Sequence, residues 1–413
     1  MVPPPSSDSA AMTAARPAFR LLLATETFAP EIGGGERQAA LLARGLTRRG
    51  HAVTLLTRQS RVESPAAAVE DGVRIVRIPP VGPGRRARWG LMLRALPALL
   101  RLRDEYDLIL VSGYRALGIP ALIAGRRLKK PVVFKADSLG ELSGGYFRAG
   151  LAERGLNADS VPLRALLRRR QRWLLGASAQ VAISEEIRGE LLAAGVEARC
   201  IHLIPNGVDT DVFRPATAGE RDELKRQLGL PEGPVVVYTG RLVSYKGLPM
   251  LLEAWLDISR RRVGTLVLVG EGGRDMHNCE AALRATVAGQ GVQDRVRFTG
   301  AAERVEDWLR AANLFVFPTE NEAFGLSLVE AMACGLAAVT TRVGGLADYV
   351  SDGHNARVIE PGDLRGLITA VETLLDDPAQ AERLGRAARA TVWLRFGHDA
   401  VAERYERLLA SLR

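Results

Sequence analysis

The sequence has few cysteines, few aromatic residues and no long apolar run. Cys200, Cys279 and Cys334 are too widely separated for a zinc-finger spacing or a disulfide framework, so we expect three buried, small apolar side chains. Aromatic residues make up only 5% of the chain, which argues against a nucleic-acid surface built from stacked rings. No run approaches the roughly 18 apolar residues of a membrane span. These absences favour a globular protein without membrane-spanning helices.

The first seventeen residues, 1–17, are rich in Pro, Ser and Ala. They contain no apolar segment of signal-peptide length, so we expect a disordered tail and a cytoplasmic protein. The whole chain of 413 residues is 47% hydrophobic and 25% charged. It is therefore long enough for two domains with separate cores.

The positive charge is concentrated in the first half of the chain. Up to residue 210 there are 31 Lys and Arg against 19 Asp and Glu, and the remainder has 25 against 28, so that +12 and −3 make up the formal charge of +9. A basic half-molecule can attract nucleic acid, an anionic membrane surface or an anionic small substrate. Composition does not choose among these partners.

Apolar strands alternate with helical patterns along the first half of the chain, which is typical of a parallel sheet covered by helices. A helix is predicted over 35–49. Strands are predicted over 20–25, 51–57, 73–78, 107–112, 131–135, 180–184 and 201–204.

A second alternation follows the turn at Pro205-Asn206-Gly207 and a polar segment that ends near residue 234. We therefore predict an α/β protein of two doubly wound, Rossmann-like domains, 18–210 and 211–394, that face a cleft. Ligands of such sheets bind beyond the carboxyl ends of the strands. The strands of the second domain are predicted over 235–239, 265–269, 296–299, 314–317, 337–340 and 357–359.

Three glycine-containing turns follow predicted strands. Gly33-Gly34-Gly35 precedes the first helix and lets the backbone approach a ligand, although its spacing is neither a dinucleotide fingerprint nor a P-loop. Arg241 and Lys246 share the next turn, and such a pair of cations suits a diphosphate. Glu271 lies in the third, Gly270 to Gly273. Each turn on its own is also compatible with a plain structural role.

Two carboxylates, Glu322 and Glu330, flank a Phe-Gly-Leu turn that precedes a predicted helix. Free N–H groups at a helix start suit phosphate, and nearby carboxylates suit sugar hydroxyls. A glycosidase also uses paired carboxylates. Because Glu330 lies on the helix beside a phosphate pocket, and because a phosphate leaving group needs cations rather than a general acid, transfer from a nucleotide sugar is the preferred interpretation.

With these motifs, the chain closely resembles glycosyltransferase family 4, whose members are retaining enzymes of the two-domain GT-B fold. The matching motifs span nearly the whole chain. They are the Gly33-Gly34 turn with Glu36 and Arg37, the run Ile204 to Asp209, Gly240-Arg241 with Lys246-Gly247, and Glu322-Ala-Phe-Gly-Leu through Glu330-Ala-Met-Ala.

The resemblance implies a role for each matched residue. Arg241 and Lys246 would bind the donor diphosphate, Glu330 the ribose hydroxyls, and Glu322 the sugar near its reacting carbon. Further donor contacts are expected at the Gly33-Gly34 turn, at Glu271, and at the backbone N–H groups of Phe324, Gly325 and Leu326. The departing phosphate would accept the proton of the acceptor, and no metal or other cofactor is expected. The last helix, about 395–413, would cross back to the first domain.

The chain departs from the family pattern after the strand at 131–135. Many members have a histidine there, and this chain reads Lys135-Ala136-Asp137-Ser138. Asp137 is the candidate for the acceptor side of the reacting centre. A second departure is Ala323, where glycine is usual.

Two basic, apolar stretches, 85–103 and 163–175, resemble helices that lie on an anionic membrane. They fit equally well amphipathic helices with a solvated arginine face. Since the first domain usually carries the acceptor in this family, we expect a sugar, lipid-linked or otherwise anionic acceptor, and a peripheral place on the cytoplasmic membrane face. The alternatives are a sugar-nucleotide hydrolase or epimerase of the same fold and, more remotely, a nucleic-acid-binding protein.

Overall fold

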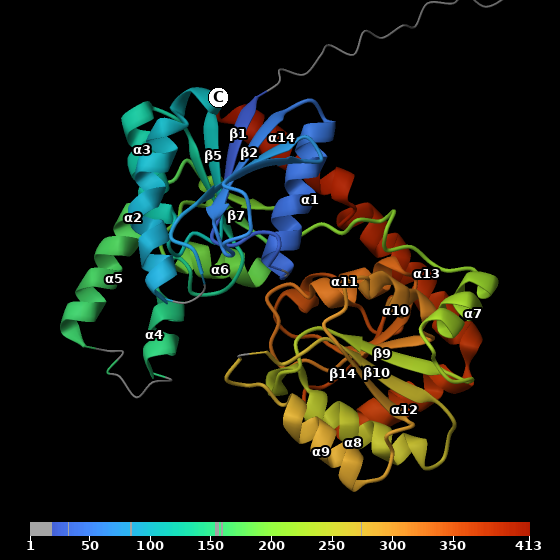
Figure 1. Cartoon of the computed structure of the whole chain (residues 1–413). Helices are drawn as coiled ribbons and strands as arrows, with labels where there is room; N and C mark the ends of the chain where they lie inside the picture. Colours follow the sequence, from blue (N-terminus) through green and yellow to red (C-terminus); the bar gives the residue numbers. More distant parts are fainter. Residues whose placement is uncertain (1–18, 32, 83–84, 153–156, 158–159, 274) are drawn as a thin grey trace, which may run out of the picture.

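The structure is a computed structural model that describes residues 19–413 except 32, 83–84, 153–156, 158–159 and 274. The tail predicted for 1–17 lies outside the described residues. The chain forms two α/β units, one above the other in Figure 1, each built on a sheet. This confirms the predicted fold class.

The N-terminal unit contains an eight-stranded sheet in the order β3-β4-β2-β1-β5-β6-β7-β8. All neighbouring strands pair in parallel except β3 and β4, which are antiparallel. The strands are β1 (Arg20–Thr25), β2 (Ala52–Arg58), β3 (Ala67–Glu70), β4 (Val73–Ile78), β5 (Leu108–Ser112), β6 (Val132–Ala136), β7 (Ala179–Ala182) and β8 (Ile201–Leu203). The helices are α1 (Gly34–Arg48), α2 (Arg85–Arg101), α3 (Gly118–Leu128), α4 (Gly145–Ala152), α5 (Val161–Leu174) and α6 (Glu185–Ala193), with short 3₁₀ turns η1 (Arg103–Glu105) and η2 (Ala198–Cys200).

The C-terminal unit contains a six-stranded parallel sheet in the order β11-β10-β9-β12-β13-β14. This is a doubly wound topology: β10 and β11 are added on one side of β9, and β12, β13 and β14 on the other. The strands are β9 (Val235–Thr239), β10 (Thr265–Val269), β11 (Val296–Gly300), β12 (Leu314–Phe317), β13 (Ala337–Thr341) and β14 (Arg357–Ile359). The helices are α7 (Ala218–Gln227), α8 (Leu248–Ser259), α9 (Glu280–Gly289), α10 (Val305–Ala311), α11 (Leu326–Ala333), α12 (Leu364–Asp376), α13 (Pro378–Arg395) and α14 (His398–Ser411), with 3₁₀ turns η3 (Ser244–Lys246) and η4 (Gly344–Asp348).

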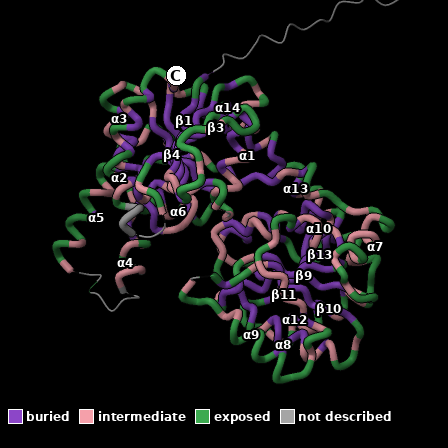
Figure 2. Tube along the Cα trace, in the orientation of Figure 1, coloured by how far each residue is buried: buried purple, intermediate pink, exposed green. Residues whose placement is uncertain are grey.

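The central strands are apolar and buried on both faces, which is why their sequences read as continuous runs rather than alternating ones. Every residue of β5, β9 and β10 is buried. Figure 2 shows the buried trace following the strands of both units, with exposed turns and outer helices around them. Helices therefore cover both faces of each sheet.

The chain returns to the N-terminal unit at its end. The α14 residues Val401, Tyr405, Leu408 and Leu409 are buried in the same apolar cluster as Leu42 and Leu46 of α1. Glu406 anchors the helix further, because its carboxylate pairs with Arg49 Nη2 at 2.5 Å and with His51 Nε2 at 3.1 Å. The end of α13 also joins the chain after β8, where the Val208 N–H donates to the Phe396 carbonyl at 2.8 Å.

The two basic stretches take different places. The first forms α2, whose Leu91, Ala95 and Leu99 are buried in the core, although Trp89 and Leu93 are exposed. The side chains of Arg85, Arg86 and Arg88 lie outside what the structure describes. The second forms α5, which is mostly exposed. Within the described residues, no helix has the length and apolar character needed to cross a membrane.

The cysteines follow the prediction only in part. All three are free, and Cys334 is buried, but Cys200 and Cys279 are only half-buried. The physical reason is their place at element boundaries: Cys200 ends η2, and Cys279 precedes α9.

Candidate active site

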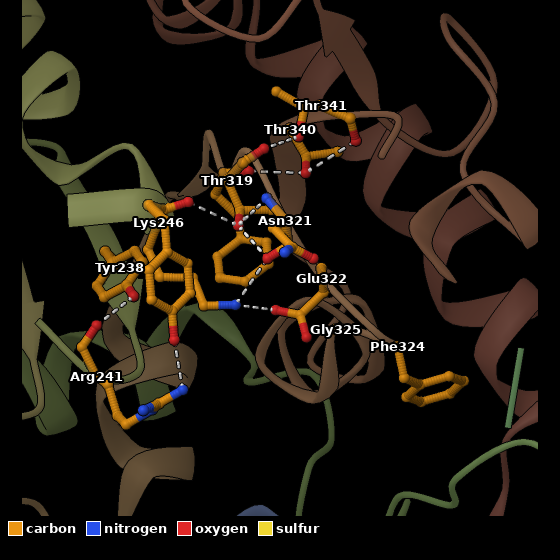
Figure 3. A network of polar contacts seen from close by, with 12 residues as sticks. Tyr238, Arg241, Lys246, Thr319, Asn321, Glu322, Phe324, Gly325, Thr340 and Thr341 are labelled. Carbon is orange, nitrogen blue, oxygen red and sulfur yellow. Dashed lines mark hydrogen bonds and ion pairs between the residues drawn. The ribbon is translucent and has the colours of Figure 1, made fainter. Parts of the chain in front are cut away.

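Lys246 and Glu322 form an ion pair between the turn after β9 and the loop after β12. Their side chains are only 11% and 18% exposed, and Lys246 Nζ also donates to the Asn321 carbonyl at 3.2 Å. Figure 3 shows the ammonium group pointing at the Glu322 carboxylate. The two predicted donor residues therefore meet, with the lysine directed into the loop that carries the glutamate.

A network of threonine hydroxyls fixes this loop. Thr341 Oγ1 donates to the Thr319 carbonyl at 2.5 Å, and Thr340 Oγ1 donates to the Phe317 carbonyl at 2.9 Å (Figure 3). Thr319 Oγ1 in turn donates to the Asn321 carbonyl at 3.0 Å. The strand β13 thus holds the backbone on which Glu322 stands.

The Phe-Gly-Leu turn places backbone donors, and not the phenyl ring, at the start of α11. The Phe324 ring is buried against Tyr349 and Phe396, and in Figure 3 it lies away from Lys246. Gly325 adopts φ of +87°, the left-handed region that favours glycine, and caps the helix. The first N–H groups of α11, from Leu326 onward, have no acceptor within the helix. N–H groups in this position can bind an anion.

Arg241 and Lys246, the two cations predicted to share one turn, each have a carboxylate partner of their own. The Arg241 side chain is 60% exposed, forms an ion pair with Asp275, and donates from Nη2 to Tyr245 Oη at 2.6 Å. Asp275 is a site neighbour that sequence reasoning missed, because it lies in a loop without a motif. The cation of Arg241 is thus held at the outer end of the turn and that of Lys246 at the inner end.

Glu330 faces the N-terminal unit from α11. Its side chain is 13% exposed, and Arg37 Nη1 of α1 lies 3.7 Å from Glu330 Oε1. Burial raises the pKa of Glu330 to about 7, and Arg37 opposes that rise. A contact between the units therefore passes directly through a predicted donor residue.

The Gly33-Gly34 turn meets the same helix. A Cβ on Gly34 would lie 3.0 Å from Leu326 Cδ1, so the start of α1 packs closely on the start of α11. A Cβ on Gly33 would lie 2.3 Å from Glu36 Oε2. Gly34 therefore permits the close approach of the two predicted donor segments, and Gly33 leaves room for the Glu36 side chain.

Asp137 lies beyond β6 and is held within the N-terminal unit. Its carboxylate pairs with Lys135 and accepts from Ser112 Oγ at 2.7 Å. Next to it, Arg115 bonds to Ser138 and lies 3.4 Å from Glu141. Burial raises the pKa of Glu141 to about 7. These residues lie at the ends of β5 and β6 or just beyond them, at the carboxyl edge of the sheet, which is the predicted acceptor side.

Glu271 has an exposed side chain, and its carbonyl accepts from the Leu242 N–H at 3.1 Å. The glycine before it is required by packing, since a Cβ on Gly270 would lie 2.0 Å from the Gly240 carbonyl oxygen. The turn that carries Glu271 thus supports the turn that carries Arg241.

Sequence reasoning also missed η4. The Gly345 N–H donates to the Glu322 carbonyl at 2.9 Å, and the Asp348 carboxylate accepts from the Glu185 N–H of α6 at 2.8 Å. This turn therefore links the Glu322 loop to the N-terminal unit. The Gly344-Gly345 pair after β13 was the available signal, of the same kind as the other glycine turns.

One group of side chains could hold a metal ion. Among the described residues, Asp209, Asp211 and His398 are the only His, Cys, Asp or Glu side chains whose ligand atoms gather in this way, within 4.8 Å of one another. They belong to the two segments that link the units, and not to the Lys246 and Glu322 loop.

Two family models match the chain. The model described as Glycosyltransferase Family 4 matches residues 32–212, and the model described as Glycosyl transferases group 1 matches residues 233–377. Together they cover both units.

Several known proteins are similar over nearly the whole chain. A D-inositol 3-phosphate glycosyltransferase of Xylanimonas cellulosilytica is 30% identical over 90% of this chain and 90% of its own length. A mannosylfructose-phosphate synthase of Agrobacterium fabrum is 30% identical over 87% of this chain and 82% of its own. Among solved structures, Anabaena HepE in complex with UDP and glucose superposes with a TM-score of 0.75 at 22% identity, covering 95% of this chain and 100% of its own. At this identity, the similarity to HepE shows that the two proteins share a fold.

Proposed function

Because the chain belongs to glycosyltransferase family 4, we propose that it transfers a sugar, with retention of configuration, from a nucleotide-diphosphate sugar to a hydroxyl group of an anionic acceptor. The observation that carries the proposal is the meeting of Lys246, Glu322 and the free N–H groups of α11 at one sheet edge. Positive charge, helix dipole and carboxylates there match a diphosphate linked to sugars.

In this proposal Lys246 exchanges part of its contact with Glu322 for the donor diphosphate, and Arg241 neutralises the outer phosphate. The N–H groups of Phe324, Gly325 and Leu326 bind the phosphate near the sugar, and Glu330 accepts hydrogen bonds from the ribose hydroxyls. Glu271 and the Gly33-Gly34 turn border the same ligand. Support comes from HepE, which was solved with UDP and with UDP-glucose.

The transfer would proceed on one face of the sugar. The bond between the anomeric carbon and the phosphate oxygen breaks, the acceptor oxygen bonds to the same face, and the acceptor proton passes to the departing phosphate. Glu322 stabilises the positive charge that develops on the sugar, and Asp137 borders the acceptor. Lys246, Arg241 and the α11 dipole compensate the leaving diphosphate, so we propose that no metal takes part.

The acceptor is proposed to be anionic, either a phosphorylated sugar or a lipid-linked envelope precursor at the cytoplasmic membrane face. The excess of Lys and Arg up to residue 210 supports this, as does similarity to proteins named for phosphorylated compounds, such as the D-inositol 3-phosphate glycosyltransferase. Vesicle flotation at low salt tests the membrane part. If the protein does not bind anionic liposomes, the membrane part is wrong.

The transfer itself is tested by incubating the protein with a panel of nucleotide sugars and phosphorylated sugar acceptors, and by determining the anomeric configuration of the product by NMR. We expect a product that retains the configuration of the donor. Inversion would contradict the proposal. Full-rate donor turnover without any acceptor would instead favour the hydrolase or epimerase.

A further inference from the structure

A groove of about 370 Å³ lies between α4, α5 and α6, outside the donor site. Helices α4 and α5 project from the edge of the N-terminal unit in Figure 1. The volume falls in the range of small-molecule sites. The polar side chains that line the groove are Ser143, Arg148, Arg164, Arg168, Gln171 and Glu190.

The helix α5 presents two different basic faces. Arg164, Arg168 and Gln171 follow helical spacing, share one face and line the groove. Arg169 and Arg172 do not line it, and they accompany Leu166 and Trp173, which are 63% and 37% exposed. Two arginines of the helix therefore line the groove, and Arg169, Arg170 and Arg172 lie outside it.

Arg164 and Arg168 bring positive charge to the groove. Glu190 is the one acidic side chain among the described residues that line the groove, and its carboxylate already accepts two hydrogen bonds: Oε2 from the Gly140 N–H and Oε1 from Ser143 Oγ, both at 2.8 Å. Within the described part of the chain, neither Arg164 nor Arg168 has a carboxylate within ion-pair distance. Arg261, by contrast, lies within 3.1 Å of two carboxylates, although it is also on the surface.

We infer that this groove is a phosphate-binding site separate from the donor site, and that Arg164 and Arg168 hold the phosphate. A guanidinium group offers a planar pair of N–H donors that matches two phosphate oxygens, and two such groups one turn apart can share one phosphate. The ligand is a phosphate ester, carried either by a soluble compound or by a lipid headgroup. The inference does not depend on the proposed transfer, because none of these residues belongs to the donor site.

The test compares two double variants of α5 that remove the same charge. R164Q/R168Q removes the two arginines of α5 that line the groove, and R169Q/R172Q removes two arginines of α5 that lie outside it. Thermal denaturation with glycerol 3-phosphate tests the soluble source. Flotation with phosphatidylcholine vesicles, with and without phosphatidylglycerol, tests the lipid source. Any binding of phosphate at the donor site is common to all three proteins, so the difference between variants reports the groove.

We expect R164Q/R168Q to bind one of these two probes about tenfold more weakly than R169Q/R172Q does. A difference with glycerol 3-phosphate identifies a soluble ligand, and a difference confined to phosphatidylglycerol vesicles identifies a headgroup. Equal loss in both double variants, or no binding by the unmodified protein, would overturn the site. If R164Q/R168Q does not fold, R164K/R168K is used instead, because it keeps the positive charge but lacks the planar pair of N–H donors. We then expect R164K/R168K to bind the probe more weakly than R169K/R172K does.

Discussion

The ammonium group of Lys246 and the carboxylate of Glu322 are ion-paired although they come from loops 76 residues apart in the chain. Each is largely buried, so each compensates the other before any donor is bound. A diphosphate that enters this site can replace the carboxylate as the partner of Lys246. The pair is thus both a structural contact between two loops and the centre of the proposed donor site.

Removing one member of this pair should cost stability as well as donor binding. We expect K246M and E322Q each to lower the free energy of unfolding, because each leaves a buried polar partner without its counterpart. The double variant should lose less than the sum, with a coupling of about 1–3 kcal/mol. Urea denaturation of the four proteins measures it. Strictly additive losses would show that the pair contributes nothing.

Gly247 should be indispensable for the position of Lys246. It adopts φ of +72°, and a Cβ there would lie 2.0 Å from the Pro318 carbonyl oxygen. Gly247→Ala should therefore lower stability by more than the roughly 1–2 kcal/mol of left-handed strain alone and abolish transfer. Gly353→Ala is the matched control, since its φ is +68° with no atom within 4 Å. Equal losses in the two variants would contradict the clash.

Glu330 should make stability depend on pH. Because burial raises its pKa from 4.5 to about 7, the folded state holds a proton that the unfolded state releases, and the stability contributed by the neutral form is lost as pH rises from about 4.5 to about 7. Glu330→Gln mimics the neutral form. As the pH rises through this range, the free energy of unfolding of the variant should therefore increase relative to that of the unmodified protein, by up to about 3 kcal/mol. Thermal denaturation at several pH values measures the difference, and a pH-independent difference would argue against a raised pKa.

Glu406 should hold α14 on the N-terminal unit. In Glu406→Ala, Arg49 and the buried His51 lose their carboxylate, and we expect a loss of about 3 kcal/mol in the free energy of unfolding. Glu382→Ala removes a pair in which both side chains are more than half exposed, and should change stability little. Guanidinium denaturation compares them. A loss no larger for Glu406 than for Glu382 would contradict the anchoring role.

Most strands could be predicted because buried parallel strands read as unbroken apolar runs. The predicted bounds of β1, β4, β9, β10, β12 and β14 are those of the structure. The strand predicted to end at Ser184 ends at Ala182, because Ser184 caps α6 and its side chain accepts from the Ile187 N–H. The strand β3 was missed, since this antiparallel edge strand has only four residues and is mostly exposed.

The candidate site was less predictable than the fold. The motifs predicted that Lys246 and Glu322 follow strands at one sheet edge and that Glu330 lies in the helix after them, and the structure has them there. Spacing alone could not show that Asp275 takes Arg241 as its partner, or that Arg37 reaches Glu330 from the other unit. Those contacts depend on how two distant segments pack. The roles of all these residues, Asp137 included, stay predictions.

The proposed donor site can be tested by measuring how nucleotide-diphosphate sugars stabilise variants of its residues. Thermal denaturation of the unmodified protein, Lys246→Ala, Glu330→Ala and the control Glu382→Gln would be followed with a panel of nucleotide-diphosphate sugars. At a hundred times its dissociation constant, the right donor should stabilise the unmodified protein and the control by about 2.7 kcal/mol. We expect this stabilisation to be lost in Lys246→Ala and in Glu330→Ala, because each variant removes a side chain of the proposed donor site. An unchanged stabilisation in both would contradict the donor site described here.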